Sequence, residues 1–181
     1  MGGAVSAGAE ADLLVLYDLA LPQVYGYLLR RCGDKNVAEE LTSETFLAAA
    51  DVAGRPDPSP LDVGWLIGVA RHKLADHWRR QAREQRNMRV VATDPTVAGA
   101  TVAGATVDPW DPRLDALHAR AALVRLAPQH QAALTLRYVD DLPVSQVAGL
   151  LGRTVHATEA LLVRARHEFR AVYDREEGSG D

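Results

Sequence analysis

A stretch in the middle of the chain, from residue 87 to residue 112, constrains the fold more than any other feature. It repeats the pentad TVAGA twice and carries no charged side chain between Asp94 and Asp108. Its glycines, Gly99 and Gly104, and its prolines neither favour a helix nor bury enough surface to offset the entropy of ordering. We therefore expect a flexible linker over 87–112, with a small domain on either side of it.

The expected domain boundaries follow from this linker. The first domain should cover residues 11–86, after a disordered N-terminal tail over 1–10. The second domain should cover residues 113–173, and the remaining residues, 174–181, are expected to form an acidic tail with no further domain after it. The sequence GRPDPSP at residues 54–60 predicts a loop within the first domain, because proline and glycine are dense there.

The spacing of apolar residues predicts helices in both domains. Only 6% of the residues are aromatic, and Ala, Leu, Arg and Glu dominate the periodic stretches. Between residues 65 and 83, one stripe of apolar side chains recurs at helical spacing and an arginine-rich stripe lies on another face. The apolar stripe consists of Leu66, Val69, Ala70, Leu74 and His77 or Trp78. We therefore expect an all-α fold made of two small helical domains.

The second domain has the spacing of four helices, and the last two are expected to form a helix-turn-helix. Pro128 should open the second helix, which is expected to end near Tyr138. Gly152 should end the third helix in a left-handed conformation, and Thr154 can cap the fourth. Two helices joined by a turn of about three or four residues with a glycine are the helix-turn-helix pattern. The expected buried stripes are Leu114, Leu117, Ala121 and Val124 in the first helix, Val144, Val147, Ala148 and Leu151 in the third, and Thr158, Leu162, Ala165 and Phe169 in the fourth.

The net charge of −4 conceals two oppositely charged segments. Between Glu10 and Asp51 there are eight acidic side chains against three basic ones, which suits a basic or polar protein partner. Between Arg71 and Arg89 there are seven basic side chains against two acidic ones, which suits phosphate groups. Each run could also be an ordinary solvated helix face, so charge alone leaves the partners open.

Several classes of function are disfavoured. Cys32 is the single cysteine, so no internal disulfide can form, and a reducing, cytoplasmic location is expected. No apolar run reaches the roughly 18 residues that span a bilayer, so membrane insertion is not expected. His72, Asp76 and His77 invite a metal-site interpretation, but arginines crowd them and no further ligands cluster elsewhere. We expect no metal, no cofactor and no catalytic residues, and therefore no enzymatic activity.

Three stretches of the chain, in order and sensibly spaced, resemble the extracytoplasmic-function (ECF) class of bacterial RNA polymerase sigma factors, in the sigma-70 superfamily. Residues 16–49 resemble region two of that class, with the sequence LYDLALPQVYGYLLRRCGDKNVAEELTSETFLAA. Residues 65–83 resemble the helix that continues region two into promoter contact, with the sequence WLIGVARHKLADHWRRQAR. Residues 126–170 resemble region four with its helix-turn-helix, from LAPQHQ to RHEFR. The resemblance implies an alternative sigma factor that binds core RNA polymerase and directs promoter-specific initiation of transcription.

The resemblance implies a contact with core RNA polymerase in the acidic segment. In that class this part of region two docks on the clamp helices of the polymerase β′ subunit, and the β flap is a further expected partner. Acidic and apolar side chains alternate here, and a protein interface needs apolar anchors within a polar rim. Leu41 and Phe46 could instead belong to the hydrophobic core. The residues assigned to core-polymerase binding are Glu39, Glu40, Leu41, Thr42, Glu44, Phe46 and Leu47.

The resemblance implies that the basic helix contacts the −10 element of promoter DNA. Its cationic side chains would bind phosphates, whereas Trp78 could either stack on an unpaired base or close the core. Trp65 is expected in the core. The loop around residues 52–62 would capture a flipped base, but its prolines depart from the family pattern, so its base preference stays open. The residues assigned to −10 contact are Arg71, Lys73, Trp78, Arg79, Arg80 and Arg83.

Region four would place its last helix in the major groove of the −35 element, N-terminal end first. Members of the class often carry basic residues where Glu159 and Leu161 stand, so this helix is poor in positive charge. Glu159 could accept a hydrogen bond from a cytosine amino group, or be repelled by phosphates if it faced the backbone. The residues assigned to −35 contact are Arg153, Thr154, His156, Ala157, Glu159, Ala160 and Arg164.

Two questions about partners stay open at this point. A separate anti-sigma factor is an expected partner, because no domain is expected after Tyr173 that could inhibit the chain instead. The alternative function is a helix-turn-helix transcriptional regulator that acts on duplex operator DNA without being a polymerase subunit. Binding to core polymerase separates the two, since such a regulator would footprint duplex DNA alone and a sigma factor needs core polymerase to do so.

Overall fold

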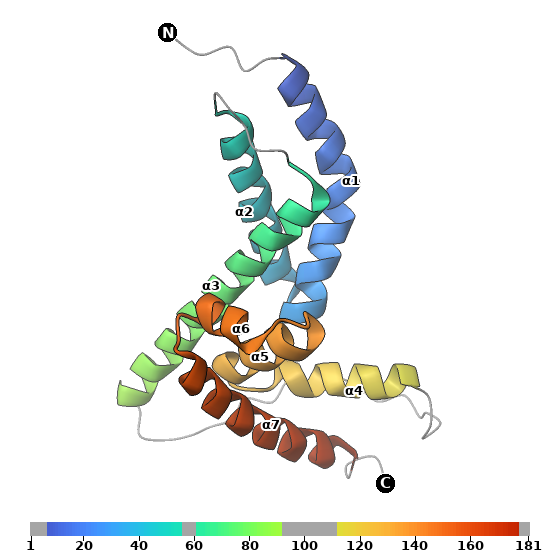
Figure 1. The fold of residues 1–181 in the computed structure, drawn as a ribbon. Helices are drawn as coiled ribbons and strands as arrows, with labels where there is room; N and C mark the ends of the chain where they lie inside the picture. The colour runs from blue at the N-terminus through green and yellow to red at the C-terminus, as the bar shows by residue number, and fades with distance from the viewer. Residues whose placement is uncertain (1–6, 56–60, 92–111, 178–181) are drawn as a thin grey trace. The chain divides into compact units, whose positions relative to one another are not determined.

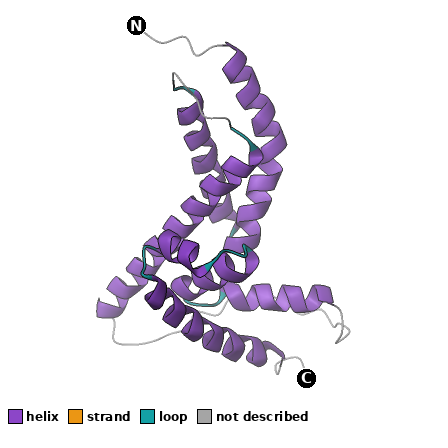
Figure 2. Cartoon of the chain, viewed as in Figure 1, coloured by secondary structure: helices purple, strands orange, loops and turns teal. Residues whose placement is uncertain are grey.

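The computed structural model describes residues 7–55, 61–91 and 112–177. Over these residues the secondary structure consists of seven α-helices and one π-helix, without a strand (Figures 1 and 2). The expected all-α fold is therefore confirmed. The chain divides into two compact units, Met1–His77 and Trp78–Asp181.

Two of the expected boundaries move when the helices are assigned. Helix α1 (Ala7–Cys32) begins within the stretch expected as a disordered tail. Helix α3 (Val63–Val91) continues past the expected domain boundary at residue 86, so the first part of the expected linker is helical. The reason is that residues 83–88, with the sequence REQRNM, are mostly good helix formers. The division between the two units also falls within α3 rather than at its end.

Other expected segments lie partly or wholly outside the described residues. The remainder of the expected linker, 92–111, is outside them, as are loop residues 56–60. Helix α7 (Val155–Glu177) runs into the stretch expected as an acidic tail, because its last turns contain helix-favouring Arg and Glu. Residues 178–181 are again outside the described part.

The first unit begins with a hairpin of α1 and α2 (Lys35–Ala53), which lie side by side (Figure 1). Gly33 has a φ of 73°, in the left-handed region that a side chain would strain. Asp34 follows as the N-cap of α2, and its Oδ1 accepts hydrogen bonds from the backbone N–H groups of Asn36 (2.8 Å) and Val37 (3.1 Å). This tight connection makes α1 and α2 antiparallel neighbours.

The buried side chains of the first unit come from all three of its helices. The core residues include Val24 and Leu28 of α1, Leu41 of α2, and Leu66 and Leu74 of α3, each at most 2% exposed. The predicted stripe of α3 is therefore confirmed at its leucines. Trp65 is only half-buried, contrary to the expected core position. Its backbone N–H donates to Oδ1 of Asp62 at 2.6 Å, so this residue belongs to the capped first turn of α3.

The second unit contains the remaining helices. They are α4 (Pro112–Val124), α5 (Pro128–Leu134), the π-helix η1 (Thr135–Val139), α6 (Val144–Leu151) and α7. The predicted start at Pro128, and an end near Tyr138, are confirmed, because η1 continues α5 to Val139. Among the described residues, Asp141 is the one non-glycine with positive φ, at 51°, directly after η1.

The predicted buried stripe of α4 is wrong. Leu117 is 59% exposed and Val124 is 41% exposed, whereas Ala122 is completely buried. The helix has a second stripe at the same spacing, formed by Ala119, Ala122 and Leu123 and leading to the buried Leu126. Alanine side chains let neighbouring backbones approach closely, and this second face is the one that packs.

The turn of the helix-turn-helix has the predicted geometry. Gly152 is left-handed, with φ 62° and ψ 41°, and the N–H of Arg153 donates to the carbonyl of Ala148 at 2.9 Å. Thr154 caps α7, because its Oγ1 accepts a hydrogen bond from the N–H of Ala157 at 3.2 Å. The predicted end of α6 at Gly152 and the predicted start of α7 at Thr154 are therefore confirmed.

One glutamate joins α7 to the start of α5. One carboxylate oxygen of Glu168 bonds to Nδ1 of His130, and the other accepts from the backbone N–H of Ala127 at 3.4 Å. Helix α5 has no local side-chain cap, so a carboxylate 41 residues away in the sequence takes that place. His130 is only 14% exposed, so loss of its partner would leave a buried polar group.

We predict that Glu168→Ala destabilises the second unit by about 1–3 kcal/mol, because it removes both hydrogen bonds at the start of α5. Urea unfolding, with hydrogen exchange at the α5 and α7 amides as the readout for this unit, measures the change. Glu159→Ala is the matched control, since Glu159 is exposed on the same helix, and it should change the stability by no more than about 0.5 kcal/mol. Equal effects of the two substitutions would show that Glu168 does not hold α5 to α7.

Candidate functional site

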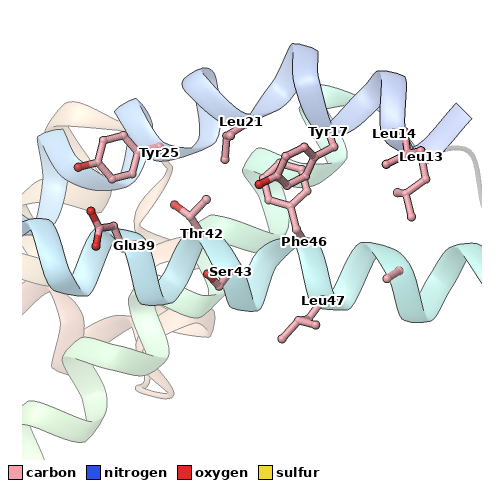
Figure 3. Close-up of a pocket in the computed structure, with 11 residues that line it drawn as sticks. Leu13, Leu14, Tyr17, Leu21, Tyr25, Glu39, Thr42, Ser43, Phe46 and Leu47 are labelled. Carbon is pink, nitrogen blue, oxygen red and sulfur yellow. The ribbon is translucent and has the colours of Figure 1, made fainter. Parts of the chain in front are cut away.

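An apolar groove of about 540 Å³ lies between α1 and α2 in the first unit (Figure 3). Both helices direct side chains into it, and most of these side chains are apolar. The lining residues are Leu13, Leu14, Tyr17, Leu21 and Tyr25 of α1, and Glu39, Thr42, Ser43, Phe46, Leu47 and Ala50 of α2.

The groove keeps large apolar side chains in contact with solvent. The rings of Tyr17 and Phe46 pack edge to face across it, with centroids 4.7 Å apart and planes at 61°. Leu14 is 67% exposed and Leu47 is 66% exposed, and both line the same groove. Exposed apolar side chains that gather in a groove with a polar edge are typical of a protein-binding site. The arrangement can accept apolar side chains of a partner helix.

The residues assigned to core-polymerase binding divide into buried and accessible groups. Leu41 and Thr42 are 2% and 5% exposed, and the Thr42 hydroxyl donates to the carbonyl of Ala38 at 2.6 Å. Leu41 is therefore a core residue in this structure, as the alternative interpretation allowed. Phe46 is half-buried and Leu47 is exposed, so both remain accessible at the groove.

The acidic residues of this set also differ in their surroundings. Glu39 and Glu40 are exposed, and Glu39 forms an ion pair with Lys35 one turn earlier, at 3.6 Å. Oε2 of Glu44 instead lies 3.2 Å from Nζ of Lys73, and the two side chains are 33% and 35% exposed. Glu44 and Lys73 were assigned to different partners, yet they bind each other and connect α2 to α3.

The assignment from sequence missed the α1 wall of the groove. A signal for it was present, because residues 13–21 read LLVLYDLAL and are apolar almost all round the helix. A single buried stripe cannot use that many apolar residues, so some of them must remain exposed or meet a partner. Of these residues, Leu13, Leu14, Tyr17 and Leu21 line the groove.

The basic helix α3 presents its arginines to solvent and conceals its tryptophan. Arg79, Arg80 and Arg83 are exposed, and Arg71 is half-buried. Trp78 is only 2% exposed, so its ring would have to leave its present surroundings before it could stack on a base. The exposed arginines are placed to contact phosphates.

The residues assigned to −35 contact lie at the N-terminal end of α7 and in the turn before it. Arg153 donates from Nη2 to Oε1 of Gln129 at 3.2 Å, so it is partly committed to the protein. His156, Glu159 and Arg164 are exposed, and the capping residue Thr154 is exposed as well. Ala157 and Ala160 are half-buried.

One sequence-based inference about this helix is wrong, and two exposed residues were missed. Leu161 is 1% exposed, so it packs inside the unit and does not replace a basic residue on the outer face. Glu159 alone therefore accounts for the expected loss of positive charge. Val155 and Val163 are 45% and 46% exposed on α7, and neither was in the candidate set.

Within residues 7–55, 61–91 and 112–177, no group of three or more His, Cys, Asp or Glu side chains could hold a metal ion. Among the helices of this part of the chain, none combines the length and the apolar character needed to cross a membrane.

Comparison with known proteins places both units in one family. Residues 16–84 match Sigma-70 region 2, and residues 118–168 match Sigma-70, region 4. The chain is 35% identical over 161 residues to the ECF RNA polymerase sigma factor BldN of Streptomyces coelicolor, an alignment that covers 86% of this chain and 58% of BldN. It is also 35% identical over 151 residues to the ECF RNA polymerase sigma factor SigL of Mycobacterium tuberculosis, with 81% of each protein covered.

A solved structure agrees at the level of the fold. The sigma factor RpoE of Bartonella quintana, determined in complex with the anti-sigma factor NepR, aligns with a TM-score of 0.50 at 17% identity. The alignment covers 90% of this chain and 97% of that one. The two family regions occur in order, and SigL is matched over most of its own length. The chain therefore belongs to the sigma-70 family, as an ECF RNA polymerase sigma factor.

Proposed function

We propose that the chain binds core RNA polymerase and directs promoter-specific initiation of transcription, a cytoplasmic and non-catalytic role. The observation that carries the proposal is the presence of both sigma regions in one chain, in order. A regulator of duplex operator DNA would need only the helix-turn-helix, and region 2 over residues 16–84 would have no purpose in it. The alternative function is therefore not favoured.

We assign core-polymerase binding to the α1–α2 groove and its acidic edge. Leu14, Phe46 and Leu47 supply apolar anchors, and Glu39 and Glu40 supply negative charge beside them. This mixture suits a helix that carries apolar side chains flanked by basic ones. The β′ clamp helices, which the family uses, are the proposed occupant, and the β flap is the proposed partner of region four. An anti-sigma factor that covered this groove would prevent the chain from binding core polymerase.

We assign the grip on the −10 element to α3 and the contact with the −35 element to α7. Exposed arginines on α3 support the first assignment, since phosphate contacts need accessible cations. The capped N-terminal turn of α7 after the helix-turn-helix supports the second, since that end of a recognition helix enters the major groove. Trp78 is left to the core in this proposal because it is buried.

Transcription in vitro with purified core polymerase tests the proposed function. Core polymerase together with the chain should start transcripts at defined promoters from a mixed DNA template, and core polymerase alone should not. The chain alone should give no footprint on those promoters. A footprint on duplex DNA without polymerase, and no change in transcript start sites, would instead support the regulator.

We predict that Leu47→Ala weakens binding to core polymerase about tenfold, because it removes an apolar anchor from the groove. Leu19→Ala is the matched control, since Leu19 is 60% exposed, close to the 66% of Leu47, but does not line the groove. Binding of labelled chain to purified core polymerase measures both affinities. Equal losses, or no loss in either variant, would remove the groove from the interface.

We predict that the double substitution Arg80→Ala and Arg83→Ala weakens holoenzyme binding to all promoters alike. Each lost phosphate contact should lower the slope of log affinity against log salt by about 0.7–0.9. Titrations of promoter DNA over a salt series measure that slope. Arg170→Ala is the control, because Arg170 is exposed on the late part of α7 and should leave the slope unchanged. A full slope in the double variant would contradict the assignment of α3 to phosphate contact.

A further inference from the structure

The outer face of α7 has no basic residue over its first two turns. The helix packs on the rest of the second unit through Thr158, Leu161, Leu162 and Ala165, each at most 4% exposed. At about 100° per residue, Glu159, Ala160 and His156 lie about 110–170° from the centre of that packed side, and Val155 lies about 70° from it, at its edge. The arginine–guanine pair, the commonest specific contact in the major groove, is therefore absent from this face.

Val155 is an exposed apolar side chain at the N-terminal end of α7. It is the first residue of α7 and is 45% exposed. The polar groups just before it are engaged within the protein: Thr154 caps the helix, and Arg153 donates to Gln129. Because a recognition helix enters the major groove N-terminal end first, Val155 would come close to the bases together with its exposed neighbour His156.

The chemistry of a valine side chain limits what it can recognise. Among the base edges in the major groove, the C5 methyl of thymine is the group that an apolar side chain contacts. Valine cannot donate or accept a hydrogen bond, so contact with this methyl is its one route to base discrimination. Val155 is only partly covered by the protein, and alanine at this first helical position would favour the helix more.

Glu159 lies one turn further along the same side. Its carboxylate is exposed and, among the described residues, makes no ion pair and no side-chain hydrogen bond. An ionised carboxylate only accepts hydrogen bonds, so it suits the amino group of cytosine and is repelled by the two acceptors of guanine. Glu159 therefore adds a preference for cytosine to the apolar preference of Val155.

We infer that Val155 is a specificity-determining residue that reads a thymine methyl group in the −35 element, next to a cytosine selected by Glu159. Four residues of helix rise about 6 Å and successive bases lie about 3.4 Å apart, so the two bases are about one or two positions from each other. The inference rests on the proposed function, because it requires region four to contact the −35 element.

A selection experiment defines the sequence that is read. Holoenzyme made from the full chain and purified core polymerase selects promoters from a DNA library randomised at both elements. The selected −35 element should contain a thymine and, one or two positions away, a cytosine. The Glu159→Gln holoenzyme should select adenine in place of that cytosine, because glutamine pairs with the N6 and N7 atoms of adenine.

A single-group substitution then tests Val155 directly. Deoxyuridine in place of the selected thymine removes only the methyl group and should weaken binding of the wild-type holoenzyme about fourfold, the effect of one buried methyl. Val155→Ala should bind the two DNAs equally, and Val155→Thr, which keeps one methyl, should retain part of the difference. Val139→Ala is the matched control, since Val139 is 52% exposed outside α7, and it should keep the full fourfold effect.

The outcomes distinguish this inference from the proposed function. Wild-type binding that ignores deoxyuridine, a full effect retained in Val155→Ala, or cytosine still selected by Glu159→Gln would each overturn the inference while leaving the sigma function intact. If no holoenzyme forms, or no −35 element is selected, the proposed role of region four fails and the inference fails with it. Circular dichroism of the variants should match the wild type, because both positions are exposed.

Discussion

The left-handed turn at Gly152 is the constraint on which the second unit depends. A side chain at a φ of 62° would cost about 1 kcal/mol or more, so glycine alone adopts this conformation readily. The turn ends α6, lets Thr154 cap α7, and directs α7 so that Thr158 and Leu161 are buried. The same geometry decides which side of α7 faces outward, and therefore which residues can meet DNA.

In the first unit, an ion pair joins two segments that were assigned to different partners. Glu44 on α2 and Lys73 on α3 form an ion pair at 3.2 Å, and a partly exposed pair of this kind contributes at most about 1 kcal/mol. The ion pair matters more for deciding which charged residues are available to each proposed partner. Glu44 sits in the acidic segment and Lys73 in the basic segment, but the pair neutralises both charges locally. Glu39 is also paired, with Lys35, so Glu40 is the exposed glutamate of this set for which no ion pair is described.

The helical spacing of apolar residues predicted where the helices lie. Which face of each helix is buried depended on contacts between helices, and no local sequence pattern contains those contacts. The caps at Gly152 and Thr154 were predictable because each is a local requirement of the backbone. Helix α4 shows the limit: two stripes have the same spacing, and packing chose the one through Ala122 and left Leu117 exposed. Likewise, the α1 wall of the groove exists only because the hairpin turn places α1 beside α2, which sets Tyr17 against Phe46.

Folding explains why the buried positions carry apolar residues, but it does not explain the exposed apolar residues in the same way. Leu41 and Leu161 are at most 2% exposed, and burying a leucine contributes about 2 kcal/mol or more, so folding alone accounts for them. Leu47 remains 66% exposed and Val155 remains 45% exposed, and folding gains little from either. A polar residue or alanine would serve the helix as well at both positions. We propose that both side chains contact partners outside the chain, a polymerase helix for Leu47 and a base edge for Val155.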